Sequence, residues 1–349
     1  MSPKERAPEV RPTRRQAHRW QKEQRRQRIA IVAGIAALLI IVSIPLYGFV
    51  ATFILPPKKV IARVNDTTFT TGYLVRLLRM QQKGAEATGQ NLDLGSMPFQ
   101  LVNVLTENEL IRQASPRYNI SVSDEEIQAE VRIRIMGKPK EGDSTPPEQL
   151  DRDFKERYRQ YLNQIQLPEQ EHRRIVRWDL SREKLRELLG QEVPTVLPHI
   201  RLYSMTLPDQ QKVDEVQRKL KQGFTFQQLA KDFSTLPSAQ QGGDQGWMPK
   251  GILDTQLEEK LFKLKKGELT EPIAKPEAGF DLYYVEDVAE ARPVEDKHRE
   301  SLKTNALQEW VNQERSKNRV EFSFDSDTYA WVVKQLKISE SRRAQPPQS

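Results

Sequence analysis

The sequence contains no cysteine, which excludes disulfides, thiolate metal sites and a cysteine nucleophile. It also lacks a Gly-x-Ser-x-Gly elbow, a Walker loop and a dinucleotide-binding fingerprint. Its few histidines are scattered without the spacing of metal ligands. The sequence therefore predicts a protein with neither a bound metal nor a cofactor. The four histidines are His18, His172, His199 and His298.

Most of the chain also lacks net charge. Lys and Arg number 55 against 48 Asp and Glu, but residues 1–28 alone hold ten basic and three acidic residues. Basic and acidic residues therefore balance in the remainder, which gives no support for a nucleic-acid-binding face. Residues 1–28 show no apolar periodicity and predict a disordered, basic cytoplasmic tail.

Residues 29–55 contain no charged side chain in 27 positions. As a helix rising ~1.5 Å per residue they would extend roughly 40 Å, more than the ~30 Å hydrocarbon core of a bilayer. A cleaved signal peptide is the alternative, but its apolar core is only about 7 to 15 residues long. We therefore predict one transmembrane helix, with the arginine-rich flank in the cytoplasm and everything after residue 56 extracytoplasmic.

Residues 56–192 predict a mostly helical lobe. It begins with a short strand and turn at 60–66, after which Thr70 or Thr71 can cap a helix. Ser123 with Glu126 forms a capping-box pattern, and the run 145–148 repeats it with proline at the first helical position. The apolar residues expected in its core are Tyr73, Leu74, Leu77, Leu78, Leu101, Val104, Leu105, Ile111, Ile127, Val131, Leu150, Phe154, Tyr158, Tyr161, Ile165, Ile175, Trp178, Leu185 and Leu189.

Residues 193–293 alternate between strand and helix patterns, which is typical of an α+β domain. The expected strands are 199–207, 245–248, 271–274 and 280–288, and the expected helices are 209–221, 225–233 and 254–264. Residues 294–336 predict a helix at 295–317, a strand at 320–324 and a helix at 327–336. The last thirteen residues, 337–349, are polar and predicted to be disordered.

The stretch 226–248 is the most informative part of the α+β domain. It begins as a short amphipathic helix, is broken by Ser234 and Pro237, and passes through Gly242 and Gly243 into a strand pattern. Taken alone, Gly-Gly-Asp is more typical of a turn than of a site. Its ordered companions are Pro198-His199-Ile200, Leu253, Leu257, Phe262, Gly267-Glu268-Leu269, Pro272 and Gly279-Phe280.

This ordered set resembles the parvulin family of peptidyl-prolyl cis-trans isomerases. The resemblance covers about a hundred residues, 193–293, and its most specific part is the run Phe-Ser-x-x-Pro-Ser-Ala-x-x-Gly-Gly-Asp-x-Gly-Trp. It implies a four-stranded antiparallel sheet and rotation about X-Pro bonds. That reaction breaks no covalent bond and crosses a barrier of ~18–20 kcal/mol, so it needs an apolar cup and one or two polar groups.

The resemblance also implies site residues. The first-strand histidine is carried over to His199, and the ring-binding Met and Phe to Leu253 and Leu257. Leu236 stands where Cys or Asp is usual, and Asp281 where a second histidine is usual. These departures predict weakened turnover, partly offset if Asp281 contacts His199. The predicted catalytic residues are His199 and Asp281, and the predicted substrate-binding residues are Leu236, Met248, Leu253 and Leu257; a structural role for His199 is the alternative.

The helical lobe is similar to the amino-terminal lobe of SurA-like and PrsA-like foldases, through the Val-Asn turn near its start and the run 120–127. The resemblance implies a chaperone for unfolded or nascent exported polypeptides with X-Pro bonds. It also implies that the carboxy-terminal segment returns to this lobe through Leu307, Trp310, Trp331 and Val332. The alternative is a non-catalytic chaperone or scaffold that uses the parvulin-like domain to bind peptides.

Overall fold

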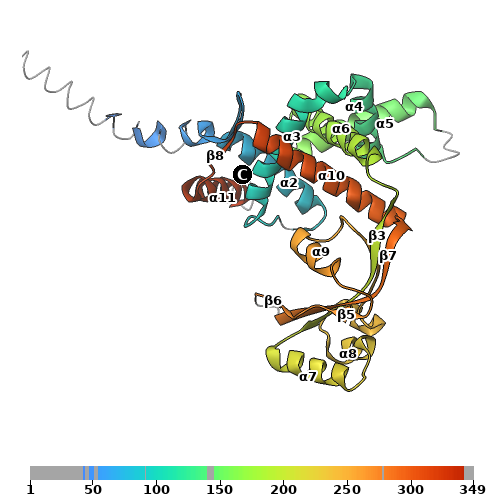
Figure 1. The fold of residues 1–349 in the computed structure, drawn as a ribbon. Coiled ribbons are helices and arrows are strands. Elements are labelled where there is room, and N and C mark those ends of the chain that lie inside the picture. The colour runs from blue at the N-terminus through green and yellow to red at the C-terminus, as the bar shows by residue number, and fades with distance from the viewer. Residues whose placement is uncertain are drawn as a thin grey trace, which may run out of the picture. The chain divides into compact units, whose positions relative to one another are not determined.

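The computed structural model describes residues 42–43, 47–50, 54–90, 92–139, 145–276 and 279–341. Figure 1 shows its helices and strands, coloured along the sequence. This part of the chain divides into two compact units. One combines the residues up to Ala62 with Thr68–Val102 and the residues from Phe322 onward, and the other combines Arg63–Thr67 with Asn103–Glu321. Each unit is therefore built from segments that are distant in the sequence.

The predicted basic tail, most of the predicted transmembrane segment and the end of the predicted carboxy-terminal tail lie outside the described residues. Within the described ranges, no helix combines the length and the apolar character needed to cross a membrane. The predicted anchor thus stays a prediction from sequence.

A small sheet contains β1 (Val60–Val64), β2 (Thr67–Thr70) and β8 (Val320–Phe322), in the order β2-β1-β8. The turn after β1 places Asn65 at φ 52°, a left-handed conformation that Asn tolerates better than most residues. We predicted the first strand and its turn but not β2. Thr70 caps the next helix as predicted, because its side chain accepts a hydrogen bond from the Tyr73 backbone N–H.

The first unit contains α2 (Thr71–Ala87) and α11 (Ser326–Ser341), which pack together. The predicted core residues Leu74, Leu77 and Leu78 of α2 are buried, as is Val332 of α11. The Lys59 ammonium binds Asp325 at 2.7 Å just before α11.

Helix α3 (Met97–Ala114) begins within the first unit. On it, Leu101, Leu105 and Ile111 are buried as predicted, whereas Val104 is 40% exposed. The prediction of a core position for Val104 is therefore wrong: residues 103 and 104 are both exposed, whereas 101–102 and 105–106 are buried, so Val104 lies on the solvent side of the helix.

The helical part of the second unit contains α4 (Asp124–Met136), α5 (Pro147–Ile165) and α6 (Glu169–Gln191). Both hydrogen bonds of the predicted capping box between Ser123 and Glu126 are present. The repeat of that device at 145–148 is not formed, because Pro146 is the N-cap and offers no side-chain oxygen. These helices share a core of Ile127, Val131, Phe154, Tyr158 and Val176.

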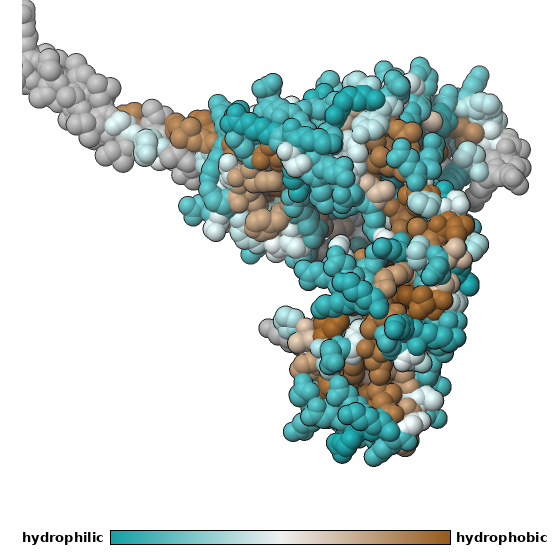
Figure 2. Space-filling view, in the orientation of Figure 1, coloured by the Kyte–Doolittle hydropathy of each residue, from teal (hydrophilic) through white to brown (hydrophobic). Residues whose placement is uncertain are grey.

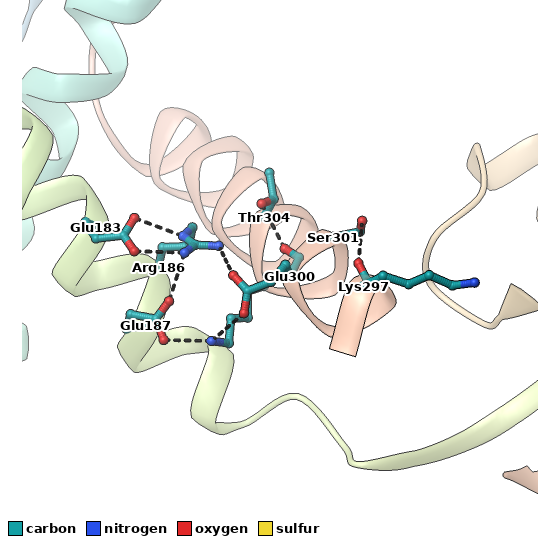
Figure 3. A network of polar contacts seen from close by, with 8 residues as sticks. Glu183, Arg186, Glu187, Lys297, Glu300, Ser301 and Thr304 are labelled. Carbon is teal, nitrogen blue, oxygen red and sulfur yellow. Dashed lines mark hydrogen bonds and ion pairs between the residues drawn. The ribbon is translucent and has the colours of Figure 1, made fainter. Parts of the chain in front are cut away.

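Helix α10 (Asp296–Lys317) packs along α6 within the same unit. Leu307 and Trp310 are buried against α3 and α6, and the Trp310 Nε1–H donates to the Tyr118 hydroxyl at 2.7 Å. A charged network joins the two helices (Figure 3): Arg186 of α6 binds Glu300 of α10 at 2.8 Å. Since this network is partly exposed, the apolar contacts contribute most of the stability of the pair.

The α+β domain contains an antiparallel sheet with more strands than the four expected from sequence. Among the described residues five strands take part, in the order β4-β3-β7-β5, with β6 also paired to β7. The expected strand at 271–274 overlaps β6, whereas β5 was not expected; both pair with β7. The strands are β3 (Val196–Leu207), β4 (Asp244–Pro249), β5 (Glu268–Leu269), β6 (Ile273–Lys275) and β7 (Gly279–Pro293).

Helices cover both faces of this sheet. On one face α7 (Gln210–Lys221) and α8 (Phe226–Phe233) pack on the odd-numbered residues of β3, such as Met205 and Leu207. On the other face α9 (Thr255–Leu261) packs on Ile200 and Leu202. Successive strand residues point to opposite faces, which explains the division. In the space-filling view apolar residues are gathered around this sheet (Figure 2).

Candidate functional site

The turn at Gly242 and Gly243 joins the short 3₁₀ segment Pro237–Gln241 to β4 and fixes one side of the site. Gly243 has φ +79°, and its backbone donates to the Ser238 carbonyl oxygen and accepts from the Ser204 N–H at 2.9 Å. A Cβ at this residue would lie 2.1 Å from the Ser204 carbonyl oxygen. Only glycine permits this close approach of β4 to β3, which gives the Gly-Gly pair of the sequence a structural reason.

The apolar half of the site lies on the α9 face of the sheet. Met248, Leu253 and Leu257 are half-buried and pack against the buried residues Ile200 and Leu202. Asp254 caps α9 by accepting hydrogen bonds from the N–H groups of residues 256 and 257, which sets where Leu257 projects. The structure therefore gathers three of the four predicted substrate-binding residues on one face.

A buried polar network adjoins this apolar surface. Asp281 of β7 is 3% exposed, and its Oδ1 accepts from the Thr206 hydroxyl at 2.6 Å. Its Oδ2 accepts from the Tyr283 hydroxyl at 3.1 Å and from the Lys275 ammonium at 2.5 Å. Burial and the neighbouring Asp281 raise the pKa of Tyr283 to about 12. The Asp281 carboxylate is thus paired on both oxygens, as a charge removed from water requires.

A second set of polar contacts lies two residues away along β3. Gln245 donates from Nε2 to the Ser204 hydroxyl at 2.9 Å and lies 3.3 Å from the Ser238 hydroxyl. Ser204 and Thr206 lie two residues apart, so both face the α9 side, in line with Leu202. Two hydroxyl side chains that alternate with Tyr203, Met205 and Leu207 at the end of β3 are the sequence signal for these contacts, which we did not predict.

The structure places His199 apart from this apolar surface, and its predicted catalytic role stays a prediction. It lies next to Ile200 on β3 and so faces away from Leu253 and Leu257. It is buried, its Nδ1 lies 2.8 Å from the Leu197 carbonyl oxygen, and its Nε2 has no hydrogen-bond partner in the described part of the chain. A structural role for His199 agrees better with these surroundings.

Nor do His199 and Asp281 contact each other. In the β3–β7 ladder His199 pairs with Ala289 and Asp281 pairs with Thr206, seven residues further along β3. At about 3.3 Å per residue this is roughly 23 Å. The possible contact between Asp281 and His199 is therefore not formed, and the partners of Asp281 are Thr206, Lys275 and Tyr283. Leu236 is half-buried just before the 3₁₀ segment, and its predicted role stays a prediction.

The surroundings of His298 give a prediction about pH. Burial, and then the charge of Lys297, lower the pKa of His298, while Glu295 and a backbone hydrogen bond with Trp247 act in the opposite direction. As pH falls through ~6.5, the unfolded chain therefore binds a proton that the folded chain resists, and stability decreases. Calorimetry of the full chain should show that the Tm falls between about pH 7.5 and 5.5. In His298→Gln this fall in Tm should be smaller than in the wild-type chain by about 2 °C or more. Equal losses in both proteins would contradict this account.

Comparison with known families defines the class of protein. Residues 208–287 match the family described as the PPIC-type PPIase domain (Rotamase). Residues 21–186 match the family described as the SurA-like N-terminal domain. The chain thus combines a parvulin-type peptidyl-prolyl isomerase domain with a SurA-like domain, as the sequence predicted.

Foldase protein PrsA of Bacillus subtilis is 37% identical over 114 residues, which cover 32% of this chain and 38% of that protein. Foldase protein PrsA of Geobacillus kaustophilus is 30% identical over 197 residues, 52% of this chain and 67% of that protein. A crystal structure of peptidylprolyl isomerase (PrsA) from Bacillus anthracis aligns with a TM-score of 0.40 at 19% identity, over 69% of this chain and 97% of that one. The chain belongs to the PrsA family of foldases, although the matched region spans little more than a third of the Bacillus subtilis protein.

Proposed function

We propose that this protein isomerises X-Pro bonds in unfolded exported polypeptides. The observation that carries the proposal is the meeting of an apolar surface, Met248, Leu253 and Leu257, with the buried polar network around Asp281. The apolar surface can hold a proline ring and displace water from the amide. The polar network holds hydrogen-bonding groups in fixed positions beside that surface. Together they meet the two requirements of a site that binds the twisted amide better than the planar one.

The site requires neither a nucleophile nor a metal, because the reaction only rotates a partial double bond. Its rate depends on how much more tightly the protein binds the twisted amide, and each ~1.4 kcal/mol of that difference gives a factor of ten. Leu236 stands where the family pattern usually has Cys or Asp, and Asp281 where it usually has histidine. We therefore propose a turnover that is weaker than a site with those groups would give.

The cellular setting is also a proposal. The charge-free run 29–55 is long enough to anchor the chain in a lipid bilayer, and the basic residues before it favour a cytoplasmic amino terminus. The folded domains would then lie on the outer side of the membrane. Since the relatives are named foldases, the clients would be polypeptides that have just crossed that membrane and are not yet folded.

The helical part would contact clients through apolar residues that remain exposed. Phe99 is 45% exposed and stacks on Tyr329, with ring centroids 5.3 Å apart, inside the first unit. Phe324 meets the edge of the same Phe99 ring. Aromatic surface that stays accessible in a folded chain is suited to bind extended apolar segments.

The proposal is tested by exchange NMR on a short peptide with an Ala-Pro bond. Without a catalyst the cis and trans signals interconvert over tens to hundreds of seconds. We expect the full chain, at a concentration well below that of the peptide, to bring the exchange into the range of about a second or less. Binding of the peptide with no faster exchange would refute the isomerase and favour the non-catalytic chaperone.

A further inference from the structure

Tyr283 belongs to both halves of the site. Its ring packs with Met248, Leu253 and Leu257 against the apolar cluster under α9. Its hydroxyl group reaches the buried network through Asp281 Oδ2. Its backbone N–H is held by the Thr270 side chain at 3.1 Å, which fixes the residue on β7. Tyr283 therefore joins the two halves of the site, with its ring in the apolar surface and its hydroxyl group in the polar network.

The three contacts of Asp281 differ in length. The Lys275 ammonium and the Thr206 hydroxyl are at 2.5 and 2.6 Å, while the Tyr283 hydroxyl is at 3.1 Å, which is long for an O–H···O bond. Lys275 and Thr206 together bond both carboxylate oxygens. The carboxylate therefore keeps a partner on each oxygen when the Tyr283 hydroxyl turns away, so releasing that hydroxyl costs little.

A released hydroxyl proton has a use in this reaction. In the planar amide the proline nitrogen shares its lone pair with the carbonyl group and accepts no hydrogen bond. In the twisted amide the lone pair is localised on nitrogen, so a donor beside it stabilises the transition state alone. A tyrosine hydroxyl is protonated at neutral pH, and the raised pKa of Tyr283 extends this to higher pH, so the donor is present under these conditions.

We infer that the Tyr283 hydroxyl is the hydrogen-bond donor to the twisted X-Pro amide, and that Asp281 is a positioning residue that acts through Tyr283. Thr206 and Lys275 hold the carboxylate in place while Tyr283 changes partner. This inference rests on the proposed function and assigns a specific donor to it. It also gives a reason for a carboxylate at position 281, where the family pattern usually has histidine.

The test is a double-mutant cycle measured by the same exchange NMR. Tyr283→Phe keeps the ring and removes the donor, so kcat should fall about tenfold, the worth of one hydrogen bond, with KM unchanged. Asp281→Asn should also lower kcat, and adding it to Tyr283→Phe should lower kcat no further.

Tyr284→Phe is the matched control. Tyr284 follows Tyr283 on β7 and packs on the opposite face of the same sheet, where its ring stacks on Phe226. Tyr284→Phe removes the same kind of hydroxyl group as Tyr283→Phe, but on the face of the sheet opposite the apolar surface. Tyr284→Phe should therefore leave kcat unchanged.

Each outcome decides a different question. An active wild-type protein whose rate survives Tyr283→Phe would overturn the inference and leave the proposed function intact. An inactive wild-type protein would refute the proposed function itself, and the donor role with it. If the double variant lost kcat by the product of the two single losses, the substitutions would act independently. That result would overturn the claim that Asp281 acts through Tyr283.

A readout that does not need turnover tests the positioning contact. With ¹³C-labelled tyrosine, the Cζ signal of Tyr283 is identified by its loss in Tyr283→Phe. Its pKa should be about 12 in the wild-type chain and should fall in Asp281→Asn, because the carboxylate opposes formation of a phenolate. An unchanged pKa would contradict the contact.

Discussion

Replacing Gly243 with alanine should lower the free energy of unfolding by about 3 kcal/mol or more, one of the largest effects expected in this protein. The left-handed backbone, at φ +79°, contributes about 1–2 kcal/mol of this for a residue with a Cβ. The remainder comes from the clash between the new Cβ and the Ser204 carbonyl oxygen, 2.1 Å away, which forces β4 from β3. Urea denaturation of the full chain measures the loss.

Gly246 provides the matched control for this substitution. It lies on β4, three residues after Gly243, and has the same φ of +79°, but no atom of the described chain would come within 4 Å of a Cβ added there. Gly246→Ala should therefore cost only the backbone contribution, about 1–2 kcal/mol. Equal losses for the two variants would show that close approach to Ser204 is not what requires glycine at 243.

The elements that we could predict well from sequence are those with strong local signals. The Ser123 capping box, the Thr70 cap and the long helix at 169–191 depend on residues close together in the chain. The stretch around Gly242 and Gly243 was also predictable, since φ > 0 and a tight turn favour glycine. Local chemistry therefore specifies the helices and the turn of the site.

The polar half of the site was not predictable in the same way. It depends on which residue of β3 lies opposite Asp281, and the β3–β7 ladder contains two register shifts, between Leu197 and His199 and between Arg201 and Leu202. A shift of one residue moves a side chain to the other face. This is why Thr206 and Tyr283 could not be predicted as neighbours of Asp281.

The number of strands was wrong for a related reason. β5 has only two residues and β6 only three, too few for any alternating pattern to be visible. Both exist because β7 offers a long edge with which they can pair. Lys275, the partner of Asp281, is the last residue of β6 and lies one residue beyond the strand expected at 271–274.

The second large effect concerns which face of the sheet binds the substrate. Leu257 of α9 and Leu220 of α7 are both half-buried helix leucines, but they pack on opposite faces. Leu257→Ser puts a polar group into the surface that should hold the proline ring and removes about 2 kcal/mol of apolar contact there, which predicts a fall in kcat/KM of about 30-fold. Leu220→Ser makes the same chemical change on the other face and should leave catalysis intact.

The most direct test of the site is therefore the X-Pro exchange rate of these two leucine variants, measured side by side at a temperature where both are folded by circular dichroism. We predict that Leu257→Ser loses most of the activity and that Leu220→Ser retains it. Retention of activity by Leu257→Ser, or an equal loss in both variants, would contradict the assignment of the site to the α9 face.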